Sequence, residues 1–150
     1  MYKEVMKKAC GWILPCMMTV SVFFSCTGKA PEYPDLEGYW KQERIENEVT
    51  GERVDCNRLY WALQLGVCEV KDLGGNGYGT YLCRYVYDPD ASTLRMYDFR
   101  VRSTQSADVE VEKLRQFGIP SKDVTFEVRL LNDDAMVLHA TDTTLCFRSF

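Results

Sequence analysis

Alternating apolar and polar positions, interrupted by turn-forming residues, run through most of the chain after residue 36. Successive side chains of a strand point to opposite faces, so this pattern predicts half-buried antiparallel strands. The clearest case is residues 124–131, where Val124, Phe126, Val128 and Leu130 share one face. Strands are predicted at residues 38–45, 59–70, 78–87, 93–101, 124–131, 135–140 and 144–150.

Turn-forming residues separate these strands. Glycine and asparagine tolerate positive φ, so the Gly-Gly-Asn-Gly sequence at 74–77 predicts a hairpin turn. Residues 46–57 are expected to form a polar connection with a turn at 50–51, and Gly66 to introduce a bulge or bend. Further turns are predicted at residues 88–92, 132–134 and 141–143.

One segment departs from the strand pattern. Its apolar residues recur at three- and four-residue spacing, which is typical of an amphipathic helix; they are Ala107, Val111, Leu114 and Phe117. Gly118 and Pro120 are expected to end this helix. We expect a helix of about ten residues, laid over the sheet or across a barrel end. The fold class is therefore all-β with one short helix, and so many antiparallel strands pack as two sheets or close into a barrel.

The first 26 residues resemble the signal of a bacterial lipoprotein. Lys3, Lys7 and Lys8 precede an uncharged, mostly apolar run at residues 9–25, and Cys26 follows the small residue Ser25. In such signals the cysteine is acylated and becomes the first residue, so lipidation is expected at Cys26. A retained transmembrane anchor and cleavage without lipid are the two alternatives, and the 17-residue run is at the short limit for a span.

The predicted organisation has three parts. Residues 1–25 are the lipoprotein signal peptide, residues 26–35 are the lipidated cysteine and a flexible tether, and residues 36–150 are one domain. Without the signal the chain has a net charge of −6 and no basic cluster. Binding to nucleic acid, whose phosphates require many Lys and Arg contacts, is therefore not expected.

Three short segments of the domain resemble the lipocalins and related calycin barrels. The Leu-Glu-Gly-Tyr-Trp sequence at 36–40 is similar to their Gly-x-Trp opening, and residues 60–65 and 145–150 are similar to the second and last strands of small lipocalin-like bacterial lipoproteins. The resemblance implies an antiparallel meander that closes into a barrel of about seven to eight strands. It also implies that Gly38 and Trp40 close one barrel end and that Arg148 packs over Trp40.

Candidate catalytic chemistry is scarce. His139 is the only histidine, and its alternation with Met136, Leu138 and Ala140 favours an outward or edge position. Most carboxylates lie in predicted turns, where they bond to backbone amides. We therefore expect a protein that is not an enzyme and that carries no cofactor and no metal.

Four cysteines remain in the domain, namely Cys56, Cys68, Cys83 and Cys146. An even number in an oxidising compartment favours disulfides, although four buried thiols are the alternative. If residues 75–76 are the turn, Cys68 faces Cys83; if the turn is 76–77, Cys83 faces Val70. The register therefore decides whether a Cys68–Cys83 bridge can form.

Two functional hypotheses follow. In the first, the barrel binds a small apolar or amphipathic ligand in its interior or at its mouth, with Trp61, Tyr81, Tyr85 and Tyr97 lining the cavity. In the second, the barrel is filled and acts as a scaffold or interaction protein on an envelope protein or glycan. The expected location is the cell envelope, with the lipid in the outer membrane and the domain facing the periplasm.

Overall fold

The computed structural model describes residues 28–150. Eight antiparallel strands follow one another in sequence order and close into a barrel through pairing of the first strand with the last. The elements are β1 (Gly38–Asn47), β2 (Arg53–Gln64), β3 (Val67–Asp72), β4 (Thr80–Asp88), β5 (Thr93–Val101), α1 (Val111–Arg115), β6 (Val124–Leu131), β7 (Ala135–Ala140) and β8 (Thr143–Ser149). The predicted all-β class and barrel are confirmed, and the strand number is the upper predicted value. The signal peptide and Cys26 lie outside the described residues.

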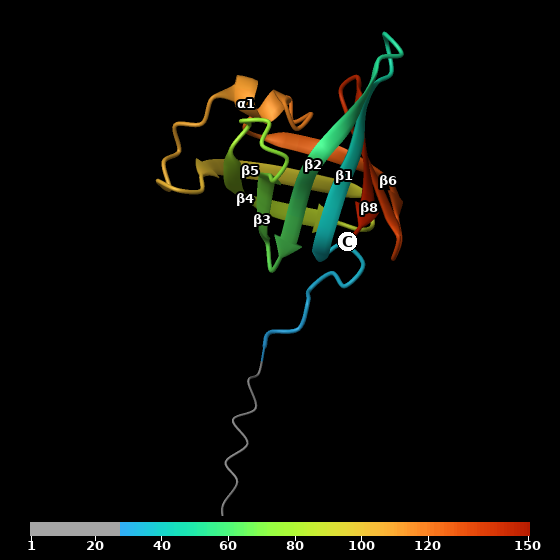
Figure 1. Ribbon diagram of the computed structural model, residues 1–150. Helices are drawn as coiled ribbons and strands as arrows, with labels where there is room; N and C mark the ends of the chain where they lie inside the picture. Colours follow the sequence, from blue (N-terminus) through green and yellow to red (C-terminus); the bar gives the residue numbers. More distant parts are fainter. Residues whose placement is uncertain (1–27) are drawn as a thin grey trace, which may run out of the picture.

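The two ends of the barrel differ. Residues 28–37 enter at one end, close to the C terminus, and α1 covers the opposite end (Figure 1). We name these the tether end and the α1 end. Leu36 is fully buried at the tether end, and the ring of Tyr33 packs edge-on against that of Tyr87 at 5.3 Å. Tyr33, which was expected in the flexible tether, therefore belongs to the fold.

The predicted strand at 59–70 is wrong in its boundaries. It contains the second half of β2, a two-residue turn at Leu65 and Gly66, and β3. Both turn residues have positive φ, 49° and 80°, which matches the backbone twist of a tight hairpin. The predicted connection at 46–57 is also too long, because β2 already begins at Arg53. Residues 53–58 of β2 are mostly exposed, so they lack the apolar alternation by which a strand is recognised.

The hairpin between β3 and β4 has the first of the two predicted registers, with Cys68 opposite Cys83. Its connection is not a two-residue turn but a loop at residues 73–79. The Asp72 carboxylate organises this loop by accepting bonds from the Gly74 amide at 2.8 Å, the Asn76 side chain at 2.8 Å and the Tyr78 amide at 3.1 Å.

Replacing Asp72 with alanine is expected to lower the free energy of unfolding by about 1–2 kcal/mol, because three donors lose a charged acceptor. Burial opposes the charge, but the donors outweigh it and hold the Asp72 pKa below its usual value. This stabilisation is therefore present above the unfolded pKa near 4 and is lost as the pH falls through the lower folded pKa. Urea unfolding at pH 7 and pH 2.5 measures both effects; a mutational cost that is equal at the two pH values would contradict the charged role.

The predicted helix is half as long as expected. Only Val111–Arg115 is helical, and Glu110 has an extended conformation with φ −73° and ψ 123°. The buried residues of this segment are Val109, Leu114, Phe117 and Ile119, so Ala107 and Val111 do not belong to its buried side. One predicted position of β6 also differs: a register shift between Val128 and Leu130 leaves Leu130 exposed.

Candidate functional site

The centre of the barrel is occupied by side chains. Trp61 is fully buried, with its ring 4.8 Å from that of Phe147 and 6.2 Å from that of Phe126, both in edge-on contact. Its indole N–H donates to Gln42 Oε1 at 3.1 Å, and Gln42 Nε2 donates to the Phe117 carbonyl at 2.9 Å. This chain of bonds joins the middle of the barrel to the segment that covers the α1 end. Gln42 was not predicted as a site residue.

Both barrel ends are covered. At the α1 end the Phe117 ring packs edge-on against Tyr78 at 5.9 Å and Tyr81 at 6.2 Å. At the tether end the Trp40 indole N–H donates to the Leu36 carbonyl at 2.9 Å, and Gly38 begins β1 beside it. Trp40 thus bonds to the segment that covers the tether end.

Arg148 does not pack over Trp40. It is exposed and bonds to Glu43 at 3.1 Å on the outer surface. Its neighbour Phe147 is buried, and successive side chains of a strand point to opposite faces, so Arg148 must point outward. The closure role expected for Arg148 is therefore wrong.

Three of the four aromatic residues expected to line a cavity point inward. They are Trp61, Tyr81 and Tyr85. The Tyr81 hydroxyl donates to the Tyr78 carbonyl at 2.9 Å, whereas the Tyr85 hydroxyl is buried without a hydrogen-bond partner. Burial raises the pKa of Tyr85 to about 12. Tyr97 lies on the outer face with the Arg95 guanidinium 4.9 Å from its ring centre, so it does not line the interior.

Cys68 and Cys83 lie directly opposite each other in the interior and are free thiols. Directly opposite residues of a hydrogen-bonded antiparallel pair have Cα atoms about 5.5 Å apart, which is within the range that a disulfide spans. Burial, helped by the neighbouring Cys83, raises the pKa of Cys68 well above its usual value. Because the thiolate is the reactive form and both sulfur atoms are buried, the folded dithiol is poorly accessible to an oxidant at neutral pH.

We expect a Cys68–Cys83 bridge to form during folding and not afterwards. Refolding with oxidised glutathione should give a protein 2 Da lighter, in which a non-reducing peptide map joins these two residues. Closing this loop should add roughly 3 kcal/mol to the free energy of unfolding. Native reduced protein in the same buffer should keep both thiols for hours; rapid oxidation of the folded form would contradict the protection by burial.

The outer surface of β2 to β5 is hollowed. Three adjoining hollows of about 570, 480 and 310 Å³ follow one another across these strands. The first two share Glu69 and Arg102, and the last two share Val67 and Leu82. We name this surface the outer groove and define it by Val67, Glu69, Lys71, Leu82, Arg84, Asp98, Arg100 and Arg102.

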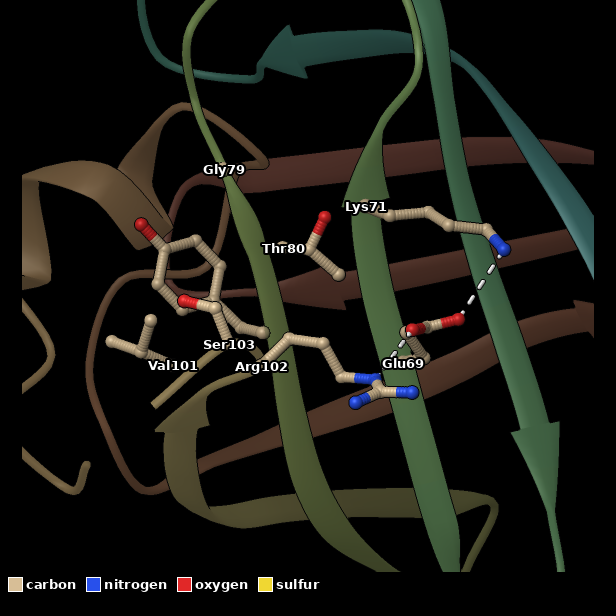
Figure 2. A pocket seen from close by; sticks show the side chains of 8 residues that line it. Glu69, Lys71, Gly79, Thr80, Val101, Arg102 and Ser103 are labelled. Atoms are coloured by element: carbon tan, nitrogen blue, oxygen red, sulfur yellow. Dashed lines mark hydrogen bonds and ion pairs between the residues drawn. The ribbon is translucent and has the colours of Figure 1, made fainter. Parts of the chain in front are cut away.

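Each acid of the outer groove is held between two bases. The Glu69 carboxylate lies 3.2 Å from Lys71 Nζ and 3.2 Å from Arg102 Nε, an arrangement that Figure 2 shows. The Asp98 carboxylate lies 3.0 Å from Arg100 and 3.7 Å from Arg84. Four cations therefore surround two carboxylates, which leaves the groove with an excess of two positive charges, whereas residues 27–150 together carry a net charge of −6.

Lys71 is the most enclosed of these cations. Its ammonium lies 4.5 Å from the centre of the Tyr39 ring and contacts Glu69. Burial lowers its pKa, but the contacts with Tyr39 and Glu69 outweigh burial, so the Lys71 pKa is raised. Lys71 therefore stays charged across the physiological range.

Other candidate chemistry is limited among residues 28–150. His139 lies on the outer face, where its Nδ1 is 3.0 Å from Thr144 Oγ1, and the Thr144 hydroxyl donates to Glu48 at 2.7 Å. This part of the chain has no cluster of three or more His, Cys, Asp or Glu side chains arranged to hold a metal ion. Across the same residues, no helix has the length and apolar character needed to cross a bilayer.

Comparison with known proteins identifies the family of this barrel. The lipocalin-like domain family matches residues 18–150. The chain belongs to this family. Two similar crystal structures are a lipocalin-like protein from Bacteroides uniformis and an uncharacterized protein from Bacteroides eggerthii. The first is 21% identical, with a TM-score of 0.62, and covers 77% of this chain and 99% of its own. The second is 18% identical, with a TM-score of 0.61, and covers 77% and 100%. No curated protein sequence matches this lipocalin-like chain.

Proposed function

We propose that this lipocalin-like protein is a lipid-anchored binding module of the cell envelope that engages its partner with the outside of a filled barrel. It holds a partner and does not convert a substrate. The lipid is attached to Cys26 in the outer membrane, and the barrel faces the periplasm. Residues 28–37 enter the barrel at the end opposite α1 (Figure 1). The α1 end would then point away from the membrane.

One observation carries this proposal. The interior positions where a lipocalin-like barrel would hold a ligand are occupied by Trp61 and by Phe126 and Phe147, which both pack against it, and segments of the chain cover both ends. Eight-stranded barrels either fill their interior with side chains or hold one small ligand, and these contacts favour the filled form. Binding then depends on the outer surface.

Native mass spectrometry of the protein, transferred from detergent into a volatile buffer, tests the filled barrel. We expect a single mass equal to that of the processed, acylated chain. Titration with a fluorescent fatty acid should show no saturable binding at micromolar concentration. A co-purified small molecule, or saturable uptake of the fatty acid at one site per chain, would overturn the proposal.

A small amphipathic ligand inside the barrel is the second candidate, and the Tyr85 hydroxyl favours it. A buried hydroxyl without a partner costs free energy, and a polar ligand atom beside it would remove that cost.

Replacing Tyr85 with phenylalanine separates the two candidates. In a filled barrel the change is expected to be neutral or to raise the free energy of unfolding by up to about 1 kcal/mol, because an unpaired polar group is removed. Tyr81→Phe is the matched control, since it deletes a hydroxyl that is bonded to Tyr78 and should cost about 1 kcal/mol. Chemical denaturation measures both variants. A loss of stability in Tyr85→Phe that accompanies loss of a bound molecule would support the interior ligand.

A further inference from the structure

The outer groove combines an aliphatic floor with a positively charged rim. Val67 is 45% exposed on the floor, and Leu82 lies beside it. The side chains of Arg84, Arg100 and Arg102 are 67%, 43% and 56% exposed along the rim. Exposed aliphatic side chains lie next to guanidinium groups that have N–H donors left for a partner. Such a surface favours a partner with both apolar and acidic groups.

The strand registers place these groups at regular levels. Lys71 pairs with Thr80, whose carbonyl accepts from the Arg102 amide, and these residues form the first level. Glu69, Leu82 and Arg100 form the second level. Val67, Arg84 and Tyr97 form the third. Successive levels are two residues apart along β3 and β4, which corresponds to about 6.5–7 Å, whereas a register shift on β5 puts three residues between Arg100 and Tyr97.

This spacing equals that of alternate side chains in an extended peptide, which also repeat every two residues. A peptide lying along β4 would place residue i at Arg102, residue i+2 over Leu82 and residue i+4 at Arg84. Along this line the three levels present Arg102, Leu82 and Arg84, which are basic, apolar and basic. The complementary sequence is acidic, any residue, apolar, any residue, acidic.

We propose that the outer groove binds an extended acidic segment of a partner protein, with carboxylates four positions apart and an apolar side chain between them. The partner carboxylates bond to the guanidinium groups of Arg102 and Arg84, which present planar N–H pairs that match a carboxylate. Arg102 shares the Glu69 carboxylate with Lys71, and Arg84 shares the Asp98 carboxylate with Arg100. Each of these two clusters has two cations and one carboxylate, so each keeps one positive charge for the partner.

A saccharide partner fits this surface less well. The floor of the groove is aliphatic and offers no flat ring on which a sugar could lie. The aromatic rings nearby are engaged, because the Tyr97 ring lies under the Arg95 guanidinium, the Tyr39 ring lies under the Lys71 ammonium and the Tyr81 ring packs against Phe117. The acidic peptide uses both properties of the groove, whereas a sulfated sugar would use only its charge.

Nuclear magnetic resonance titration of the full processed protein with the peptide acetyl-Glu-Ser-Val-Ser-Glu-amide tests this inference. We expect saturable shifts of the Val67 and Leu82 methyl signals, with a dissociation constant below about 1 mM, the range of a small exposed contact. The isomer acetyl-Glu-Glu-Val-Ser-Ser-amide has the same composition and should bind at least fivefold more weakly. Raising NaCl from 50 to 500 mM should weaken binding at least fivefold, because exposed charges are screened.

Charge reversal supplies the matched control. Arg84→Glu and Arg102→Glu should each weaken binding at least tenfold. Arg53→Glu changes the net charge equally at an exposed site on β2 outside the groove, and should weaken binding less than twofold. Arg84→Gln introduces no negative charge that repels a carboxylate, so its loss of binding should lie between those of Arg84→Glu and Arg53→Glu. All three positions are exposed, so melting curves should show that the barrel remains folded in all four variants.

Several results would overturn the inference. The first is equal affinity for the two peptides. The second is an equal loss of peptide affinity in Arg53→Glu and Arg84→Glu. The third is a set of chemical-shift changes centred away from Val67 and Leu82. Tighter binding of a sulfated hexasaccharide than of the peptide would assign the groove to glycans instead. The inference rests on the proposed function, but different results would refute the filled barrel and the peptide-binding groove. A retained small molecule in the native mass spectrum refutes the filled barrel, whereas an empty barrel that ignores the peptide refutes only the groove assignment.

Discussion

Replacing Trp61 with alanine is expected to lower the free energy of unfolding by about 3–5 kcal/mol, the range for deleting a large aromatic ring from a packed core. The ring is fully buried and contacts Phe126 and Phe147, so its removal leaves a void that neighbouring side chains fill only in part. The change also removes the donor to Gln42 Oε1, which then remains buried and unpaired. The whole stability of a small domain is about 5–15 kcal/mol, so the variant should melt far below the native protein.

Urea unfolding measured by circular dichroism checks this prediction. Tyr97→Ala is the control, because that ring lies on the outer face and its loss should cost less than about 1 kcal/mol. Trp61→Phe keeps part of the ring and loses the indole N–H, so it should fall between the two. A cost below about 1 kcal/mol for Trp61→Ala would mean that the barrel interior is open at this position, and it would contradict the filled barrel.

The same contacts predict that Trp61 and Gln42 act together. Gln42 bonds to both Trp61 and the Phe117 carbonyl, so the barrel centre and the covering segment are coupled through one amide. In a double-mutant cycle with Gln42→Ala, the two losses should therefore not add. The covered end of the barrel depends on a buried polar residue as well as on the apolar residues around it.

Sequence patterns predicted those parts of the fold that depend on local chemistry. Buried positions alternate with more exposed ones along β4 and β7 and along the first halves of β5 and β6, and the turns beside these strands contain Asp, Asn, Gly or Pro. The division between β2 and β3 was missed because Leu65 is an unusual residue at positive φ, and the apolar run continues through it. The helix was overestimated because Ala107 continues a helical spacing that the extended conformation of Glu110 interrupts.

The interior and the groove depended on information that one sequence does not contain. Gln42 follows Trp40 at an inward position, and a polar residue in an apolar alternation is a signal for a buried hydrogen bond. The sequence therefore indicates a buried hydrogen bond at Gln42, but it does not identify Trp61 and Phe117 as the partners. The outer groove contains residues from β3, β4 and β5, and only the register of three strands brings Glu69, Leu82 and Arg100 to one level. Alternation shows that these side chains point outward but not which of them are neighbours.

Replacing Cys26 with serine is expected to abolish acylation completely, which is the largest chemical change predicted for this chain. Each buried methylene contributes roughly 0.8 kcal/mol to membrane binding, and a single acyl chain holds a protein only marginally, so two or three chains on one cysteine would hold it permanently. Growth with an alkyne-tagged fatty acid, followed by mass spectrometry of the N-terminal peptide, measures the acyl groups. Cys56→Ser removes a cysteine of the barrel and should keep the full label.

The acyl mass is a better readout than release from the membrane, because an unprocessed apolar run at residues 9–25 would itself hold the variant there. The barrel should be indifferent to this change. Its contacts with the entering chain begin at Tyr33 and Leu36, seven or more positions after Cys26. Protein produced from residue 28 onward should therefore melt at the same temperature as the acylated protein and bind the acidic peptide equally well. Label retained by Cys26→Ser would place the lipid elsewhere, and a lower melting temperature without residues 1–27 would show that the anchor segment is part of the fold.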